Sequence, residues 1–189
     1  MEKITENTQI EGCGIATMIR PIKVIIILLS FLLALPSVSI ALQFKVKRVL
    51  DGDTILVVWQ NLEIKVRLVG IDAPEVGEKK HETGQLYGRK ATKYLAKLVL
   101  NKNVRVEEYG SDRYARMLGV VFVNGTNVNL EMVRLGLAEV YRGRLPRYFN
   151  PKIYQEAEAE AKRIGIGIWY FKDKYVSPME WRKMRRKDN

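Results

Sequence analysis

Cysteine and histidine are almost missing from this sequence. Its 189 residues include one cysteine, Cys13, and one histidine, His81. A single cysteine excludes a disulfide scaffold, and the two residues together cannot form the Cys and His clusters that hold zinc. Any chemistry that this chain performs must therefore come from carboxylates, arginines, lysines and hydroxyl groups.

Acidic residues are scarce relative to basic ones. The chain has 32 Lys and Arg against 21 Asp and Glu, a formal net charge of +11 at pH 7. Residues 1–41 hold three residues of each sign, so the whole excess lies in residues 42–189. An excess of this size favours polyanionic partners such as nucleic acid, anionic lipid or polyphosphate. The hydrophobic content of 47% is ordinary for a globular protein, which argues against a largely disordered chain.

The N-terminal segment contains one strongly hydrophobic run. Residues 24–35 (VIIILLSFLLAL) are apolar except for Ser30, and they follow the basic residues Arg20 and Lys23. A small-x-small sequence then ends at Ala41. This order is typical of a secretory signal peptide that is cleaved after Ala41.

An uncleaved membrane anchor is the alternative. Residues 22–42 are long enough to span about 30 Å of hydrocarbon, although Pro36, Ser37 and Ser39 weaken that interpretation. We therefore predict that residues 1–41 form an N-terminal tail with a signal peptide or anchor. The protein is expected to be exported, either secreted or periplasmic or in the cell envelope, and to associate with a membrane only if the segment is not cleaved.

The body of the chain has the pattern of a small barrel. Alternating and β-branched runs predict five short strands, at residues 44–47, 54–59, 63–68, 103–109 and 117–123. Helical spacing predicts three helices, at residues 86–99, 130–135 and 151–165, with Asn129 as the cap of the second. Helices after the third and fifth strands are typical of an OB-fold. We expect an α+β domain, a five-stranded OB-fold β-barrel with three helices, over residues 42–175, followed by a loosely held basic tail over residues 176–189.

Three polar clusters interrupt this pattern, and each alone is typical of a solvated turn or loop. They are Asp51-Gly52-Asp53-Thr54, the run from Arg67 to Glu75, and Asp112-Arg113-Tyr114-Ala115-Arg116. Together they supply what phosphodiester hydrolysis needs: a base, positive charge for the phosphate, and ligands for a hard cation. Asp53 and Asp72 offer oxygen ligands that suit Ca²⁺ or Mg²⁺, and Arg67 and Arg116 offer planar donors that suit phosphate.

The same clusters resemble the thermonuclease family, the staphylococcal-nuclease-like enzymes. The D-G-D-T turn, the R-L-x-x-x-D-x-P-E run and the D-x-Y-x-R loop occur in the order expected for that family. V-N-x-x-x-V-x-x-G-L-A follows at residues 128–138, and G-I-W at residues 167–169. The resemblance covers residues 43–171 and is specific, because no single short motif carries it.

The resemblance implies a nuclease of the micrococcal type, an endonuclease and exonuclease that depends on calcium. It implies hydrolysis of both DNA and RNA, with 3′-phosphate ends as products. Glu75 would be the general base that activates water, and Arg67 and Arg116 would stabilise the phosphorane-like transition state. We expect a monomer with nucleic acid as its substrate.

The resemblance also implies binding residues. Asp53, Asp72 and the backbone carbonyl of Ala73 would bind Ca²⁺, with Asp51 as a supporting acid. The substrate would be contacted by Arg113, Tyr114 and Tyr141.

Two positions depart from the family pattern. Ala73 stands where the family often has threonine, which preserves the carbonyl but removes a hydroxyl. Ala115 stands where a glycine commonly precedes the second arginine. If that position needs a positive φ, alanine strains the loop. Neither change removes a catalytic group.

The sparse ligand set has a consequence for location. Two carboxylates and one carbonyl make a weak calcium site, and dissociation constants of about 10⁻⁴ to 10⁻³ M are typical of extracellular calcium modules. The metal site and the export signal therefore agree. The alternative is a non-catalytic OB-fold nucleic-acid-binding protein of the cell envelope, and a weaker one is a membrane-surface protein; neither would need Asp53, Arg67, Asp72, Glu75 and Arg116 together.

Overall fold

The computed structural model describes residues 42–77 and 84–187 of the chain. The predicted signal peptide or anchor, apart from Leu42, lies outside these residues, and so does His81. Within the described ranges, no helix is both long and apolar enough to cross a membrane.

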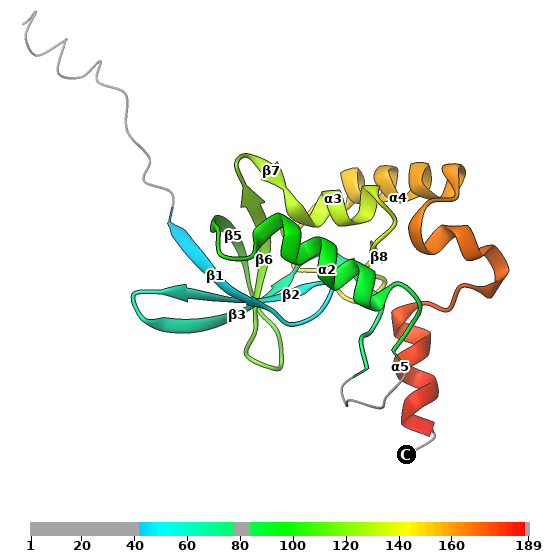
Figure 1. The fold of residues 1–189 in the computed structure, drawn as a ribbon, viewed down its shortest axis with the longest axis horizontal. Coiled ribbons are helices and arrows are strands. Elements are labelled where there is room, and N and C mark those ends of the chain that lie inside the picture. The colour runs from blue at the N-terminus through cyan, green and yellow to red at the C-terminus, as the bar shows by residue number, and fades with distance from the viewer. Residues whose placement is uncertain (1–41, 78–83, 188–189) are drawn as a thin grey trace, which may run out of the picture. The chain divides into compact units, whose positions relative to one another are not determined.

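Five strands of the described chain form a closed barrel (Figure 1). They are β1 (Gln43–Val49), β2 (Thr54–Trp59), β3 (Leu62–Leu68), β5 (Asn103–Ser111) and β6 (Met117–Val123). Their order is β3-β2-β1-β5-β6, and a parallel pairing of β3 with β6 closes the barrel. The predicted α+β class with a five-stranded barrel is confirmed.

Side-chain alternation explains why these segments are strands. In β1, Phe44 and Val46 point into the core while Lys45 and Lys47 are exposed. In β3, Val66 and Leu68 are buried by the same period of two residues. β2 is almost wholly buried, which is why its sequence is a continuous apolar run rather than an alternating one.

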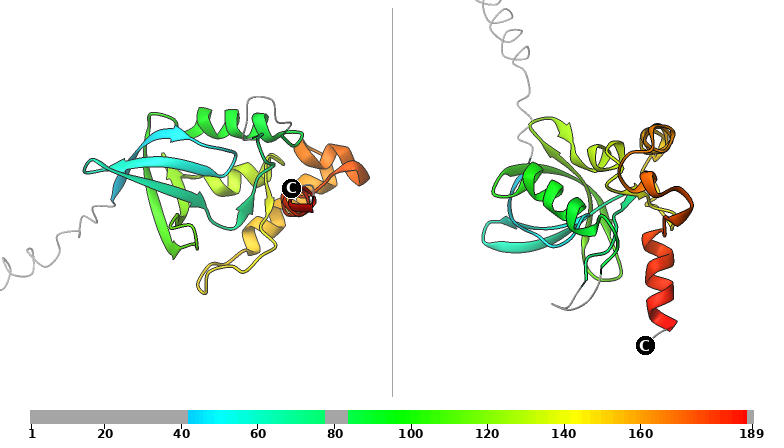
Figure 2. Two further views of the ribbon diagram at one scale, coloured as in Figure 1. Left: turned by 90° about the horizontal axis from the view of Figure 1, so that it is seen from below. Right: turned by 45° about the vertical axis from the view of Figure 1, so that its right-hand side comes forward.

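The three predicted helices form; α2 and α3 pack on the barrel, and α4 packs on α3 (Figure 2). α2 (Gly88–Val99) places Ala91, Leu95 and Val99 in the same core cluster as the strands. α3 (Val128–Arg134) and α4 (Lys152–Ile164) pack against each other, and α4 ends at Gly165 with a left-handed backbone, a common helix stop.

Several elements were not predicted from the sequence. β4 (Ile71–Asp72), β7 (Thr126–Asn127) and β8 (Glu139–Val140) are two-residue strands, too short to show any periodicity. A 3₁₀ helix, η1 (Gly167–Lys174), follows α4. Beyond it, the segment expected to be a loosely held tail contains the helix α5 (Pro178–Lys187).

α5 forms because its first turn is capped. The Ser177 backbone N–H donates to Glu180 Oε2, and the Glu180 backbone N–H donates to Ser177 Oγ, both at 3.2 Å. This reciprocal pair is a capping box, which satisfies two backbone donors that a helix start leaves free.

The predicted cap of α3 was wrong. Asn127, not Asn129, caps this helix, and its side chain accepts a hydrogen bond from the Leu130 backbone N–H at 3.0 Å. The shift of two residues matters because it turns Asn129 inward rather than toward the helix end.

Asn129 is a buried polar link between α3 and the barrel. Its Nδ2 donates to the carbonyls of Val69 and Gly119, and its Oδ1 accepts from the Val121 backbone N–H, all at 3.0 Å. The Val69 carbonyl belongs to the turn that follows β3, so this side chain helps to fix the strand end that carries Arg67.

We therefore expect Asn129→Ala to lower the free energy of unfolding by about 2–4 kcal/mol, because it leaves buried backbone groups without partners. Urea denaturation followed by tryptophan fluorescence measures this. Asn127→Ala, which removes a partly exposed cap, should cost about 1 kcal/mol. Equal losses in the two variants would contradict the assignment of Asn129 as the main buried link.

Candidate active site

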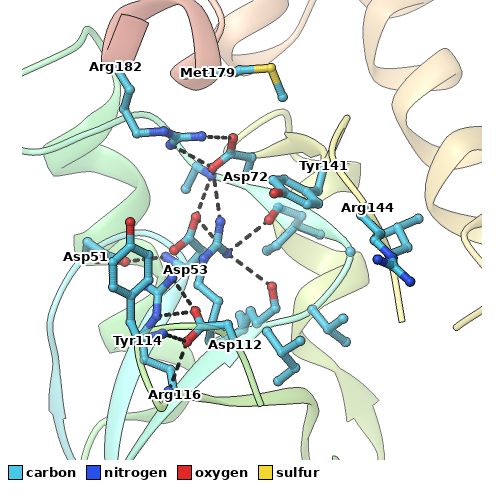
Figure 3. A pocket seen from close by; sticks show the side chains of 18 of the residues that line it. Asp51, Asp53, Asp72, Asp112, Tyr114, Arg116, Tyr141, Arg144, Met179 and Arg182 are labelled. Atoms are coloured by element: carbon cyan, nitrogen blue, oxygen red, sulfur yellow. Dashed lines mark hydrogen bonds and ion pairs between the residues drawn. The ribbon is translucent and has the colours of Figure 1, made fainter. Parts of the chain in front are cut away.

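The three polar clusters meet in one cleft of about 660 Å³ (Figure 3). It lies where the β1–β2 turn, the end of β3, β4, the β5–β6 loop and α5 come together. All nine residues predicted to act in catalysis or binding line it: Asp53, Arg67, Asp72, Ala73, Glu75, Arg113, Tyr114, Arg116 and Tyr141. The structure brings the whole predicted set together, and the role of each residue stays a prediction.

Arg67 lies at the end of β3 between two carboxylates. Its Nη1 is 2.9 Å from Asp53 Oδ2, and its Nη2 donates to Asp72 Oδ1 at 3.0 Å. The same guanidinium donates to the carbonyls of Leu68 and Ile71 at 3.2 and 3.0 Å. The guanidinium therefore connects the two ends of the turn between β3 and β4.

The local chain path explains this arrangement. Thr54 pairs with Arg67 across β2 and β3, which places the preceding Asp53 beside the arginine. Gly70 then adopts a φ of +82° and reverses the chain, so that Asp72 returns to the same guanidinium. A Cβ at Gly70 would meet the Phe149 ring at 2.2 Å, so no other residue fits this reversal.

Asp53 is a buried acid among other acids. Its Oδ2 accepts from the Ala73 backbone N–H at 2.8 Å, and its Oδ1 accepts from Thr54 Oγ1 at 3.1 Å. Burial raises the pKa of Asp53 well above its usual range, and the nearby Asp51 and Asp72 raise it further against the lowering effect of Arg67. Such a group of carboxylates favours the approach of additional positive charge.

Glu75 follows Pro74 and extends into the cleft with a side chain about one third exposed. Gln85 holds its backbone from both sides: Gln85 Oε1 accepts from the Glu75 N–H at 2.9 Å, and the Gln85 N–H donates to the Glu75 carbonyl at 2.8 Å. Gln85 belongs to none of the sequence motifs, so sequence reasoning missed this positioning residue.

Arg116 is fixed by Asp112 within the β5–β6 loop. Its Nε and Nη2 lie 2.8 and 2.7 Å from Asp112 Oδ2, while Oδ1 accepts from the backbone N–H groups of Tyr114 and Arg116. Burial would raise the pKa of Asp112, but these hydrogen bonds outweigh it and lower the pKa. Asp112 is therefore a stable anion that orients Arg116.

Ala115 has a φ of +56°, so this position does require the left-handed conformation. The strain of a non-glycine residue there is about 1–2 kcal/mol. The loop keeps its shape because the Asp112 side chain bonds the backbone on both sides of Ala115.

The predicted substrate-binding residues lie at the edge of the cleft. Tyr114 is exposed, and the guanidinium carbons of Arg113 and Arg116 lie 4.9 and 5.5 Å from its ring centre. Tyr141 follows β8, where its N–H donates to the Gly70 carbonyl at 2.9 Å and its ring lines the cleft (Figure 3).

α5 contributes an arginine that the sequence analysis did not assign to the site. Arg182 Nη2 lies 2.7 Å from Asp72 Oδ2, and its Nη1 donates to Asp72 Oδ1 at 3.1 Å (Figure 3). The same Nη1 donates to Glu75 Oε1 at 2.6 Å. The capping-box sequence S-P-M-E could have indicated the helix. No local pattern indicates where that helix docks.

The donor set fits a hard cation under one condition. Among residues 42–77 and 84–187, no three His, Cys, Asp or Glu side chains group in a way that could hold a metal ion. The predicted set is smaller, two carboxylates and the Ala73 carbonyl, and all its donors are oxygens that suit Ca²⁺ or Mg²⁺. Asp72 already binds two guanidinium groups, those of Arg67 and Arg182. A divalent cation fits this set if Arg182 leaves Asp72.

Glu139 is a further buried acid behind the cleft. It pairs with Asp72 across β4 and β8, and the Tyr175 hydroxyl donates to its Oε2 at 2.9 Å. Burial raises the pKa of Glu139 to about 7; the Tyr175 hydrogen bond opposes this shift and the charge of Asp72 adds to it.

Glu139 should make stability depend on pH. Its pKa is near 4.3 in an unfolded chain and about 7 when folded, so the folded state holds the extra proton between these values. Its favourable contribution is complete below pH 4 and is lost as the pH rises through 7. We expect the free energy of unfolding of the wild type, relative to Glu139→Gln, to fall by about 2 kcal/mol between pH 4.5 and 8. Urea denaturation across this range measures it, and a constant difference would contradict the shift.

The barrel and its cleft define a class, an OB-type domain with acids, arginines and an exposed tyrosine at one site. The family model described as "Staphylococcal nuclease homologue" matches residues 65–170, more than half of the chain. The chain belongs to the staphylococcal nuclease family.

Curated relatives agree with this membership. The chain is 39% identical over 143 residues to an "Uncharacterized endonuclease" of Haemophilus influenzae, covering 75% of this chain and 74% of that protein. It is 39% identical over 156 residues to an "Uncharacterized endonuclease" of Escherichia coli O157:H7, covering 82% and 94%. It is also 39% identical over 150 residues to "Micrococcal nuclease" of Shigella flexneri, covering 74% and 79%.

Proposed function

We propose that this protein is a calcium-dependent, sugar-nonspecific nuclease that hydrolyses phosphodiester bonds of DNA and RNA and leaves 3′-phosphate ends. The observation that carries the proposal is the convergence of Glu75, two arginines and two buried carboxylates in one cleft. Family membership and the endonuclease and micrococcal nuclease relatives support the same reaction class.

The buried acids would hold the cation. Asp53, Asp72 and the Ala73 carbonyl are its ligands in this proposal, and the bound cation would neutralise phosphate charge and make water more acidic. The carboxylate of Glu75, partly exposed and directed into the cleft, takes the proton from the attacking water. Gln85 holds the Glu75 backbone, so this base acts from a fixed position.

Arg67 and Arg116 form ion pairs with different acids, and we assign them different roles in the reaction. Arg67 is locked between Asp53 and Asp72, so it presents a fixed positive charge beside the cation ligands. Arg116 forms its ion pair with Asp112 on a partly exposed loop, and it stabilises charge that develops on the phosphoryl oxygens.

The edge of the cleft suits a single strand of either sugar type. Tyr114 and Tyr141 offer rings on which a base can stack, and stacking does not distinguish ribose from deoxyribose. Arg113, Lys65 and Arg144 also line the cleft and contact phosphates. The net charge of +11 attracts the polyanion to this edge.

We further propose that the protein is a monomer that acts after export, secreted or in the periplasm or cell envelope, and anchored in the membrane if residues 22–42 are not removed. A weak calcium site supports this location, because extracellular calcium modules work at about 10⁻⁴ to 10⁻³ M.

Arg116→Ala should lower the turnover rate on single-stranded DNA by about 10²–10³, because it removes one donor to the transition state. Its fold should persist, since Arg116 is tied only to its own loop. Arg163→Ala, on the exposed surface of α4, is the matched control and should retain full activity. Unchanged turnover in Arg116→Ala would contradict the role of this arginine.

Arg67→Ala should also abolish cutting. Unlike Arg116→Ala, it should lower the stability of the fold. Because Arg67 is the shared partner of two buried carboxylates, its removal should lower the free energy of unfolding by about 3–5 kcal/mol. Denaturation of both variants separates the structural contribution from the catalytic one.

Chelation by EDTA should abolish cleavage of DNA and RNA, and added Ca²⁺ should restore it. The products should resist extension by a DNA polymerase until a phosphatase removes the 3′-phosphate. Undiminished cutting in EDTA would exclude the calcium mechanism. Tight binding of nucleic acid without cleavage in Ca²⁺ would support the alternative, a non-catalytic OB-fold binder.

A further inference from the structure

α5 places the positively charged guanidinium of Arg182 in the proposed active site (Figure 3). Arg182 binds both carboxylate oxygens of Asp72, at 3.1 and 2.7 Å, and its Nη1 also donates to Glu75 Oε1 at 2.6 Å. One of these acids is the proposed cation ligand and the other is the proposed base. A single side chain from the end of the chain therefore occupies both groups that hydrolysis needs.

Apart from this contact, α5 has few fully buried side chains. The structure describes all ten of its residues, and Pro178 is the one that is buried. The helix carries five basic residues and one acidic residue, so it gains little from packing and repels the arginines of the cleft. The ion pairs of Arg182 with Asp72 and Glu75 offset this repulsion.

The docked position of α5 also has an unfavourable feature at Trp181, the neighbour of Arg182. Its indole N–H is buried and has no hydrogen-bond partner among the described residues. A buried donor without a partner is unfavourable, and movement of the helix would let this group bind water.

The segment before α5 is anchored, which places the point of movement. Gln85 Nε2 donates to the Val176 carbonyl at 2.8 Å, and the Tyr175 hydroxyl donates to Glu139. The chain is therefore fixed up to Val176, and α5 begins two residues later at Pro178. Release of the helix would move Ser177 with it, because Ser177 caps α5, and would expose Pro178.

We propose that α5 is a latch, a helix that closes the site through Arg182 and that a divalent cation releases. The inference rests on the proposed function in one respect, that the cation binds Asp72. A cation at Asp72 and the guanidinium of Arg182 compete for the same two oxygens and repel each other. Binding of one therefore weakens binding of the other by the same factor.

Movement of α5 couples the binding of a cation at Asp72 to the release of Glu75 as the base. While Arg182 is docked, Glu75 Oε1 accepts a hydrogen bond from the guanidinium, and this oxygen is not free to accept a proton from water. When the cation displaces Arg182 from Asp72, the Glu75 contact is lost with it. The cation then completes the site and frees the base in one step.

The test is a titration of the full-length chain with CaCl₂ in the absence of nucleic acid. Calorimetry measures the affinity for Ca²⁺, and tryptophan emission reports the surroundings of Trp181. The wild type should show a saturable red shift as α5 leaves. Trp181→Phe should lose that shift, which assigns it to α5 rather than to Trp59 or Trp169.

Arg182→Gln removes the latch contact and should bind Ca²⁺ about tenfold more tightly than the wild type, a typical size for coupling between two sites. Lys187→Gln is the matched control: it removes one positive charge from the exposed end of the same helix, outside the cleft, and should leave the affinity unchanged. Arg182→Lys keeps the charge but cannot bind Asp72 through two N–H groups, so its affinity should fall between those of Arg182→Gln and the wild type.

Equal Ca²⁺ affinity in Arg182→Gln and Lys187→Gln, or a wild type without a Trp181 response, would overturn the latch. If Ca²⁺-dependent cleavage persists in that case, the proposed function stands and the latch alone fails. If Ca²⁺ binds and releases Trp181 but DNA stays intact, the latch stands and the proposed function fails.

Discussion

The ion pairs of Arg67 with Asp53 and Asp72 are the constraint on which the site depends. Two acids from different segments are buried within reach of one guanidinium, which also binds the carbonyls of the intervening turn. Buried like charges destabilise a fold unless a partner of opposite charge lies between them, and removal of that partner leaves them unpaired. The positions of the turn, of β4 and of both acids are therefore set together, as one network rather than as separate contacts.

The barrel determines which loops meet at that network. The parallel pairing of β3 with β6 places Arg67 opposite Leu118, two residues beyond Arg116. The β5–β6 loop must therefore end beside the turn that carries Asp72. Asn129 fixes the same region from behind, because it bonds the carbonyls of Val69 and Gly119. Closure of the barrel thus brings together two charged segments that lie about fifty residues apart in the sequence.

A cleft that combines buried acids with an exposed carboxylate attracts any available cation. In this chain the C-terminal helix supplies one, and the contacts of Arg182 satisfy the oxygens of Asp72 that would bind the metal ion in the proposed function. The same electrostatics accounts for the docking of α5, and in the proposed function it would attract a metal ion to the acids and a polyanion to Arg113, Lys65 and Arg144. A metal ion and the Arg182 guanidinium would compete for the same acids. A polyanion would bind the basic side chains instead.

Local sequence determined the five barrel strands, the helices α2, α3 and α4, and the composition of the site. Alternation in β1 and β3 and helical spacing in α2 reflect which side of each element is buried, and the nine site residues lie within or close to recognisable motifs. Tertiary structure alone decided the inward turn of Asn129, the support of Glu75 by Gln85 and the docking of Arg182. Asn129 and Arg182 depend on partners 60 and 110 residues away, and Gln85 depends on Glu75, which lies ten residues away in a different motif. A hydrogen bond across more than a hundred residues leaves no periodic trace in the sequence, because it forms only after the barrel has closed and placed Asp72 within reach of the C-terminal helix.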